Sequence, residues 1–213
     1  FQKNVTTWSE LSSIFGVVVQ QTGPINVYVR SDARGTTATF AKWLETADEN
    51  NNTNSADYEW TLGHEEALSF PSGINSVDGN PSVSSGVISD EHGIGYVSLA
   101  FMEGATPVDL FNPGNDEWVT PSILNAVRAI PPNLTTPGQS IMNSEIEGAY
   151  PISRLLFYMV NKYNLLTNTV TFLTWCLLQG QLFVPTVGYV PINGTSAQSY
   201  SLDVISNLIQ YVS

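Results

Sequence analysis

Apolar side chains along this chain alternate between the spacing of an amphipathic helix and the spacing of a strand. From Trp8 to Phe15 they recur three and four residues apart, directly after the potential cap Thr7, which predicts a helix. From Ile25 to Val29 apolar and polar residues alternate after a Gly-Pro pair, which predicts a strand. Helix and strand patterns continue to alternate without an internal repeat, and this order is typical of an α/β layer structure.

The same criteria place the remaining elements. Asn80-Pro81 and Thr120-Pro121 each set a capping residue before a proline suited to the first helical position, so both pairs are expected to start helices. Helices are predicted near 36–47, 81–89, 121–129, 169–178 and 202–211, strands near 93–100 and 154–160, and loops at 48–55 and 131–139.

The charge balance excludes some classes of function. The chain has 213 residues, with 19 acidic and 7 basic side chains and a formal net charge of −12. A nucleic-acid binder needs clustered Lys and Arg, so this class is excluded. Hydrophobic residues make up 42% of the chain, enough for a packed core in one or two domains. The most apolar segment, Leu155 to Val190, is interrupted by polar residues, so we expect no transmembrane helix.

Cysteine and asparagine usage bears on the compartment. The single Cys176 excludes an intramolecular disulfide and a multi-cysteine metal cage, and its apolar surroundings predict burial. Four triplets of the N-x-S/T type, at Asn4, Asn51, Asn133 and Asn193, are candidate glycosylation sites. There is no basic segment followed by an apolar one, so we expect a cytosolic chain, a processed chain or part of a longer one. The triplets and the scarcity of lysine favour an extracellular protein.

Signals for catalysis or metal binding are weak. His64 is followed by two glutamates, but the H-E-x-x-H spacing fails because position 68 is Leu. We therefore expect His64 and His92 to be solvated loop residues. No G-x-S-x-G elbow is present. The sequence predicts no enzymatic activity, no catalytic residue, no metal and no cofactor.

Two of the seven basic residues, Arg30 and Arg34, lie in one turn between a predicted strand and a predicted helix. Such a turn exposes unpaired backbone N–H groups and the positive end of the helix dipole, and both favour an anion. Gly35 allows the backbone to approach a ligand, and the hydroxyls of Thr36 and Thr37 can donate hydrogen bonds.

Asp32 stands between the two arginines in this turn. Its carboxylate could orient Arg30 or accept a proton from a protonated oxyanion, while a guanidinium can hold an oxyanion through two parallel hydrogen bonds. The alternative is a capped helix start with a surface Arg–Asp pair. Local chemistry leaves both interpretations open.

The stretch Arg-Ser-Asp-x-x-Gly-Thr-Thr from Arg30 to Thr37 resembles the phosphate loop R-S-D-G-S-G-T of the phosphate-binding proteins that serve ATP-driven phosphate importers. These are two-lobed receptors with a periplasmic-binding-protein-like fold. Other segments resemble pieces of that family in the same order, namely 1–8, 70–73, 79–80, 83–87, 92–97, 150–154, 172–175, 180–181 and 188–191. The resemblance implies a mixed sheet flanked by helices.

The resemblance also assigns roles to the loop residues. It implies that Arg30, Gly35 and Thr36 contact phosphate and that Asp32 supports the arginine. Arg34 stands where the family has a serine, and this longer cationic side chain could strengthen anion capture or fill the site.

The family comparison further implies that residues 1–150 form the second lobe, which carries the anion loop. Residues 151–213 would then be a return strand and C-terminal helices that pack on a first lobe, most of which this chain lacks. The missing lobe or a neighbouring subunit, as in a homo-oligomer, would have to cover the apolar residues of this part. These are Leu155, Leu156, Phe157, Tyr158, Phe172, Trp175, Leu177, Leu182 and Phe183.

Two functions follow from the sequence. The first is an extracellular solute-binding domain that holds inorganic phosphate or a similar oxyanion, for uptake. The alternative is a structural or adhesive glycosylated surface protein that reuses this scaffold, favoured by the incomplete ligand shell, by the arginine at position 34 and by the candidate glycosylation sites.

Overall fold

The computed structural model describes residues 1–16, 18–51 and 59–212, with the side chains of 47–51 left out. The chain divides into two compact units, Phe1–Pro107 and Val108–Ser213. The family resemblance predicted a boundary between residues 150 and 151, which separates the part of the chain in the second lobe from the part that packs on the first lobe. This boundary stays a prediction.

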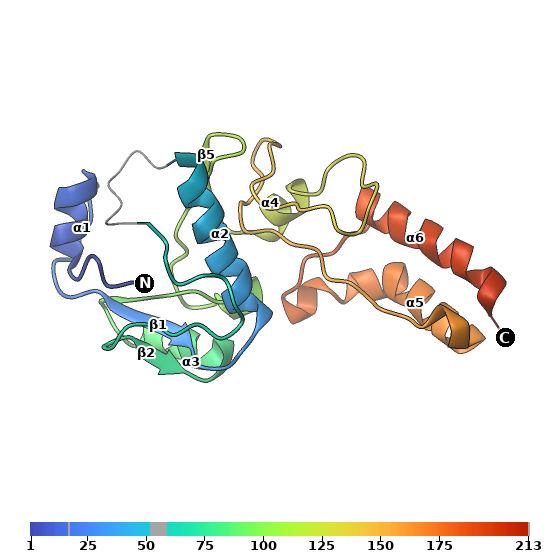
Figure 1. Ribbon diagram of the computed structural model, residues 1–213, viewed down its shortest axis with the longest axis horizontal. Helices are drawn as coiled ribbons and strands as arrows, with labels where there is room; N and C mark the ends of the chain where they lie inside the picture. The colour runs from blue at the N-terminus through green and yellow to red at the C-terminus, as the bar shows by residue number, and fades with distance from the viewer. Residues whose placement is uncertain (17, 52–58, 213) are drawn as a thin grey trace. The chain divides into compact units, whose positions relative to one another are not determined.

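Unit 1 is built on a three-stranded parallel sheet with strand order β2-β1-β3. Figure 1 shows the long helix α2 on one side of this sheet and α3 on the other, which is the α/β arrangement expected from the sequence. The elements are α1 (Trp8–Phe15), β1 (Asn26–Arg30), α2 (Gly35–Asn51), β2 (Asn75–Val77), α3 (Gly79–Ile88), β3 (Gly93–Gly95) and the short 3-10 helix η2 (Leu99–Phe101).

The core of unit 1 lies on one face of β1. Ile25, Val27 and Val29 are buried together with Tyr96, because alternate residues of a strand point to the same face. The ring of Phe40 from α2 stacks on Tyr96 with the ring centroids 4.5 Å apart. This packing fixes α2 against the sheet, and the intervening residues of β1 face the other helix.

The helix α3 approaches the sheet closely because a glycine lies on each side of the contact, Gly86 in α3 and Gly95 in β3. A Cβ atom on Gly86 would lie 2.4 Å from the Tyr28 ring, and one on Gly95 would lie 2.8 Å from the Val83 side chain and 2.9 Å from the Tyr28 carbonyl oxygen. Neither position has room for a side chain, so the glycines set the distance between α3 and the strands.

Unit 2 begins with an antiparallel pair of strands and ends with two helices that contact each other. The buried Asn112 side chain fixes the strand pair by donating hydrogen bonds to the carbonyls of Ser144 and Ala149 at 2.9 and 2.8 Å. The elements are β4 (Leu110–Asn112), β5 (Glu117–Val119), α4 (Ile123–Arg128), η3 (Lys162–Asn164), α5 (Thr167–Leu177), η4 (Gln179–Leu182), η5 (Pro185–Val187), α6 (Ser196–Leu208) and η6 (Ile209–Tyr211). The predicted mixed sheet is thus found as a parallel sheet in unit 1 and a separate antiparallel pair in unit 2.

The predicted helices all occur, but some of their starts were placed wrongly. The cap of α1 is Thr7 as predicted, and its hydroxyl accepts the Glu10 amide at 3.1 Å. The helix α3 starts at Gly79, so Asn80 lies inside it and is not its cap. Proline is tolerated there because the first-turn N–H groups have no partner within the helix. For α4 the cap is Ser122 instead of Thr120.

Other element boundaries also differ from the sequence prediction. The predicted loop at 48–55 is wrong for residues 48–51, because α2 continues through them, and residues 52–55 lie outside the described part. The strand expected over 93–100 is limited to β3, whereas the proline-rich loop at 131–139 is confirmed.

The prediction of a strand over 154–160 is wrong, because no residue of this segment lies in a strand. A strand is defined by hydrogen bonds to a neighbouring strand, and within the described ranges no strand pairs with this segment. The apolar run that suggested a buried strand is instead exposed at Leu156, Phe157, Tyr158 and Met159.

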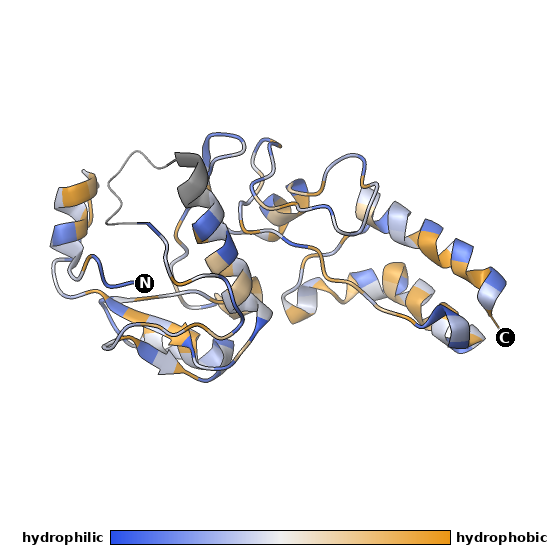
Figure 2. Cartoon of the chain, in the orientation of Figure 1, coloured by the Kyte–Doolittle hydropathy of each residue, from blue (hydrophilic) through white to orange (hydrophobic). Residues whose placement is uncertain are grey.

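Most of the predicted apolar face in the C-terminal part is exposed. In Figure 2 hydrophobic positions recur along α5 and α6. Leu177 is buried between these helices, and Leu155 packs on a second small cluster, so both belong to the core. The exposed members, here called the apolar face, are Leu156, Phe157, Tyr158, Phe172, Trp175, Leu182 and Phe183.

Cys176 is free and buried, as its apolar neighbourhood predicted. Among the residues that the structure describes, no helix is long and apolar enough to cross a bilayer.

Candidate anion-binding site

The carboxyl ends of parallel strands meet at one edge of a sheet, and in unit 1 this edge carries the charged turn. Arg30 is the last residue of β1. The next amide, that of Ser31, donates to the carbonyl of Val77 at the end of β2 with an N–O distance of 2.9 Å. Asn80 from the start of α3 and Ser98 from the segment after β3 reach the same place.

Arg30 and Asp32 form a two-pronged ion pair. The Arg30 Nε donates to Oδ1 of Asp32 at 2.9 Å, and Nη2 donates to Oδ2. The Arg30 side chain is only 8% exposed and that of Asp32 is 22% exposed. These hydrogen bonds hold the pKa of the Asp32 carboxyl far below its ordinary value, against the effect of desolvation, and they raise the pKa of Arg30. Both groups are therefore charged at neutral pH.

Both oxygens of the Asp32 carboxylate are occupied. Oδ1 also accepts the backbone amide of Gly79 at 3.3 Å, and Oδ2 lies 3.3 Å from Nε of Arg34. Of the two roles that the sequence left open, this geometry favours orientation of Arg30 over acceptance of a ligand proton.

The remaining nitrogen of the Arg30 guanidinium is held by two further residues. Nη1 donates to the hydroxyl of Thr36 at 3.5 Å and to Oδ1 of Asn80 at 3.2 Å, and both of these residues also contact the Ser98 hydroxyl. Asn80 and Ser98 were missed from the sequence. The signal that could have found them is their position three residues beyond the ends of β2 and β3, the strands parallel to β1.

The first turn of α2 supplies backbone donors. The carbonyl of Arg34 accepts the amides of Thr37 and Ala38 at 3.1 and 3.3 Å, as the residue preceding a helix does. Within the described part of the chain, the amides of Gly35 and Thr36 have no hydrogen-bond acceptor. These two N–H groups are available to an anion.

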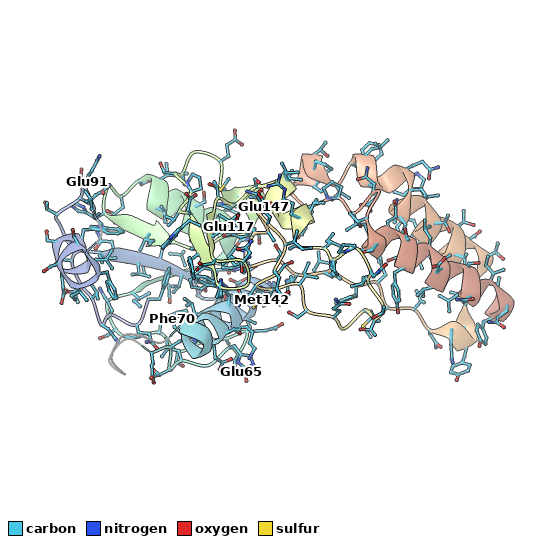
Figure 3. The ribbon with its side chains drawn as sticks, turned by 90° about the horizontal axis from the view of Figure 1, so that it is seen from above. Glu65, Phe70, Glu91, Glu117, Met142 and Glu147 are labelled. Carbon is cyan, nitrogen blue, oxygen red and sulfur yellow. The ribbon has the colours of Figure 1, made fainter. Side chains whose placement is uncertain are left out.

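A loop from unit 1 anchors this turn. The carbonyl of Glu66 accepts the Arg34 amide at 3.2 Å, and the neighbouring Glu65 and Phe70 are labelled beside α2 in Figure 3. The backbone of residue 34 is therefore held on both sides, while its side chain remains 66% exposed.

Thr37 lies apart from the other predicted site residues. It is buried, with 1% of its surface exposed, and its hydroxyl lies 2.8 Å from the hydroxyl of Tyr96. This hydroxyl supports the packing of α2 on the core instead of facing solvent beside Thr36.

The assembled groups suit the binding of an oxyanion. The turn offers a guanidinium, a second guanidinium, one hydroxyl and two backbone amides, all of which donate hydrogen bonds to an oxyanion. In the described residues, no cluster of three or more His, Cys, Asp and Glu side chains could hold a metal.

The two histidines differ in environment. His64 is half exposed and its Nδ1 lies 2.8 Å from Oε2 of Glu45, so it is a surface residue as predicted. The prediction is wrong for His92, whose side chain is only 25% exposed because its ring packs against Gly23.

Three of the asparagines in glycosylation triplets are exposed, namely Asn4, Asn133 and Asn193. The side chain of Asn51 lies outside the described residues. Glycosylation of the four positions stays a prediction.

The chain matches a known protein family. A family model described as a PBP superfamily domain matches residues 1–177, most of the chain. The chain belongs to this family, as its phosphate-loop motif and its α/β fold indicated.

The relatives are named for phosphate binding. Two proteins called phosphate-binding protein PstS, from two strains of Xylella fastidiosa, are 28% and 27% identical over 177 residues, which cover 79% of this chain and 46% of each relative. The chain thus spans about half the length of the curated relatives it matches.

A solved structure shares the fold. It is that of PfluDING, a high-affinity periplasmic phosphate-binding protein bound with phosphate at pH 8.5. The TM-score is 0.59 at 18% identity, and the match covers 100% of this chain and 67% of that one.

Proposed function

We propose that this chain binds inorganic phosphate or a similar oxyanion at the turn from Arg30 to Thr36, as part of an uptake receptor. The observation that carries the proposal is the preorganised Arg30 guanidinium, held at 8% exposure by Asp32, Thr36 and Asn80. A guanidinium that is already oriented loses little conformational entropy when an anion binds. The relatives named as phosphate-binding proteins support this choice of ligand.

The proposed binding set is small. Arg30, Arg34 and Thr36 contribute side-chain donors, and Gly35 with Thr36 contributes backbone amides. Asp32 positions Arg30. Together these groups replace the hydration shell of the anion without covalent chemistry.

Calorimetric titration of the chain with phosphate tests the proposal. Replacement of Arg30 by alanine should weaken binding on the order of 100-fold, because a charge-assisted contact at the centre of the site is lost. Lys42→Ala removes the same charge from the exposed surface of α2, where Lys42 pairs with Glu45, and should leave the affinity within about twofold. Equal affinities of the Arg30 variant and the unmodified chain would contradict the proposal.

We further propose that another polypeptide covers the apolar face. Both the relatives and the solved structure contain a part that this chain does not span, and that part is our proposed cover. Within the described residues no strand pairs with the backbone of 154–160, and this backbone together with the exposed apolar side chains would contact the cover. Sedimentation analysis should find self-association of the chain, whereas a monodisperse monomer that binds no hydrophobic dye would contradict this proposal.

The uptake role places the protein outside the cytoplasm. The solved neighbour is called periplasmic, and the exposed Asn4, Asn133 and Asn193 leave room for glycans. The adhesive or structural alternative receives no support from the comparisons, since the relatives are named for phosphate binding.

A further inference from the structure

The side chain of Arg34 has a role that the matched loop motif does not supply. The residue stands immediately before α2, and its carbonyl accepts the amides of Thr37 and Ala38. It therefore occupies the N-cap position of this helix. Ser, Thr, Asp and Asn are preferred there because their side chains accept a first-turn amide, whereas a guanidinium has no acceptor.

Two energetic consequences follow for the ligand-free protein. The amides of Gly35 and Thr36 lack a cap within the described residues. The positive charge of Arg34 also stands at the positive end of the helix dipole, where cations are unfavourable. An anion bound at this turn would remove both penalties.

The side chain of Arg34 is held by one polar contact. Its Nε lies 3.3 Å from Oδ2 of Asp32, an oxygen that also accepts Nη2 of Arg30. Within the described structure the Nη1 and Nη2 atoms of Arg34 have no hydrogen-bond partner, and the side chain is 66% exposed. The guanidinium is therefore largely exposed and not buried in the turn, and the donors on Nη1 and Nη2 are available to a ligand.

The charge of the turn depends on this residue. Arg30 and Asp32 cancel each other, so Arg34 supplies the one net positive charge among the three ionised side chains. The rest of the protein is strongly acidic, with a net charge of −12. A local positive charge helps to attract an anion to such a surface.

We propose that Arg34 is a specificity-determining residue that keeps the start of α2 uncapped and positive, so that a dissolved oxyanion serves as its cap. The inference rests on the proposed phosphate binding at the same turn. It assigns to the site a ligand that carries full negative charge and accepts several hydrogen bonds, and it excludes neutral polar solutes.

The test uses three substitutions in the full chain. Arg34→Ser supplies a capping hydroxyl, Arg34→Lys keeps the charge without a cap, and Arg34→Ala has neither. Without phosphate, the serine variant should melt about 3 °C above the unmodified chain, and the lysine variant should melt within about 1 °C of it. Phosphate affinity should fall about tenfold in the serine and alanine variants and stay within about threefold in the lysine variant.

The outcomes separate this inference from the proposed function. If Arg30→Ala abolishes binding but Arg34→Ser binds phosphate as tightly as the unmodified chain, the site stands and the role of Arg34 is refuted. If the serine variant is no more stable without phosphate, the uncapped helix start is refuted, and this readout needs no ligand. If neither arginine affects phosphate binding, both proposals fail.

Discussion

The hydroxyl of Thr37 and the phenolic hydroxyl of Tyr96 lie 2.8 Å apart at the junction of α2 and the segment after β3. Both residues are buried. The pair links the helix that starts at the proposed anion-binding turn to the core of unit 1.

Removal of one hydroxyl of this pair should destabilise the protein. Thr37→Val keeps the side-chain shape but removes the Thr37 partner of the buried Tyr96 hydroxyl, which also interacts with the backbone of Arg30, so the free energy of unfolding should fall by about 1 kcal/mol. The double variant with Tyr96→Phe should be less destabilised than the sum of the single variants, since the Thr37–Tyr96 hydrogen bond is lost only once. Urea denaturation measures both, and a double variant as unstable as the sum of the single ones would contradict the pairing.

The Arg30–Asp32 pair predicts a pH-dependent stability. Asp32→Asn leaves Arg30, 8% exposed, without its counterion, and should lower the free energy of unfolding at pH 7 by about 2 kcal/mol; the partial exposure of Asp32 keeps the loss below that of a fully buried pair. The folded pKa of Asp32 is depressed mainly by the hydrogen bonds from Arg30. Its stabilisation is therefore present above the unfolded pKa of about 4 and lost as the pH falls toward the folded value.

Urea denaturation at a series of pH values checks this, and the difference between Asp32→Asn and the unmodified chain should shrink below about pH 4. Glu45→Gln is a suitable control, because Glu45 pairs with Lys42 and His64 at the surface and should change stability by less than about 0.5 kcal/mol. A pH-independent difference for Asp32→Asn would contradict the linkage.

Substitution of Asn80, a residue outside the phosphate-loop motif, should lower the affinity for phosphate. Its Oδ1 accepts Arg30 and its Nδ2 donates to Ser98. Asn80→Ala should weaken phosphate binding about tenfold by releasing one side of the guanidinium. Asn75→Ala serves as a control, since this exposed asparagine donates to the Val27 carbonyl, and should leave calorimetric affinity within about twofold. Equal affinities for the two variants would remove Asn80 from the site.

The burial of Tyr150 should make the folded protein less stable at alkaline pH. Burial raises the pKa of its phenol to about 12, whereas an unfolded tyrosine has a pKa of about 10. The folded state thus disfavours the phenolate, and the stability contributed by the neutral form is complete below about pH 10 and lost as the pH rises toward about 12. At about pH 11 the Tyr150→Phe variant should gain about 1 kcal/mol over the unmodified chain, relative to their difference at pH 8. Parallel urea stability curves from pH 8 to pH 11 would refute this.

Local signals in the sequence sufficed for β1 and α2, the two elements that flank the charged turn. The alternation from Ile25 to Val29 and the helical spacing after Gly35 placed Arg30 and Thr36 at a strand-to-helix turn, as the structure has them. Asn80 was mistaken for a helix cap because its partner, Arg30, is 50 residues away. A contact of this kind depends on the order of strands in the sheet, which local periodicity does not encode.

The failure at 154–160 has a similar origin. β-branched and aromatic composition reports that a segment suits a sheet, but the neighbouring strand that would make it one is a separate requirement. Within the described residues that neighbour is absent. The segment 154–160 therefore has the composition of a strand but, in the described part of the chain, no neighbouring strand to pair with.

The close contact of Gly95 with α3 affects the position of the residues at the proposed binding site. Because Gly95 allows Val83 to pack directly on β3, the start of α3 lies close enough to the sheet for the Gly79 amide to donate to Oδ1 of Asp32 at 3.3 Å. A methyl group at position 95 would push α3 away from the sheet, which would withdraw the Gly79 amide from Asp32 and the Asn80 side chain from Arg30. The affinity that we propose for this turn therefore depends on how closely α3 packs on the face of the sheet opposite α2.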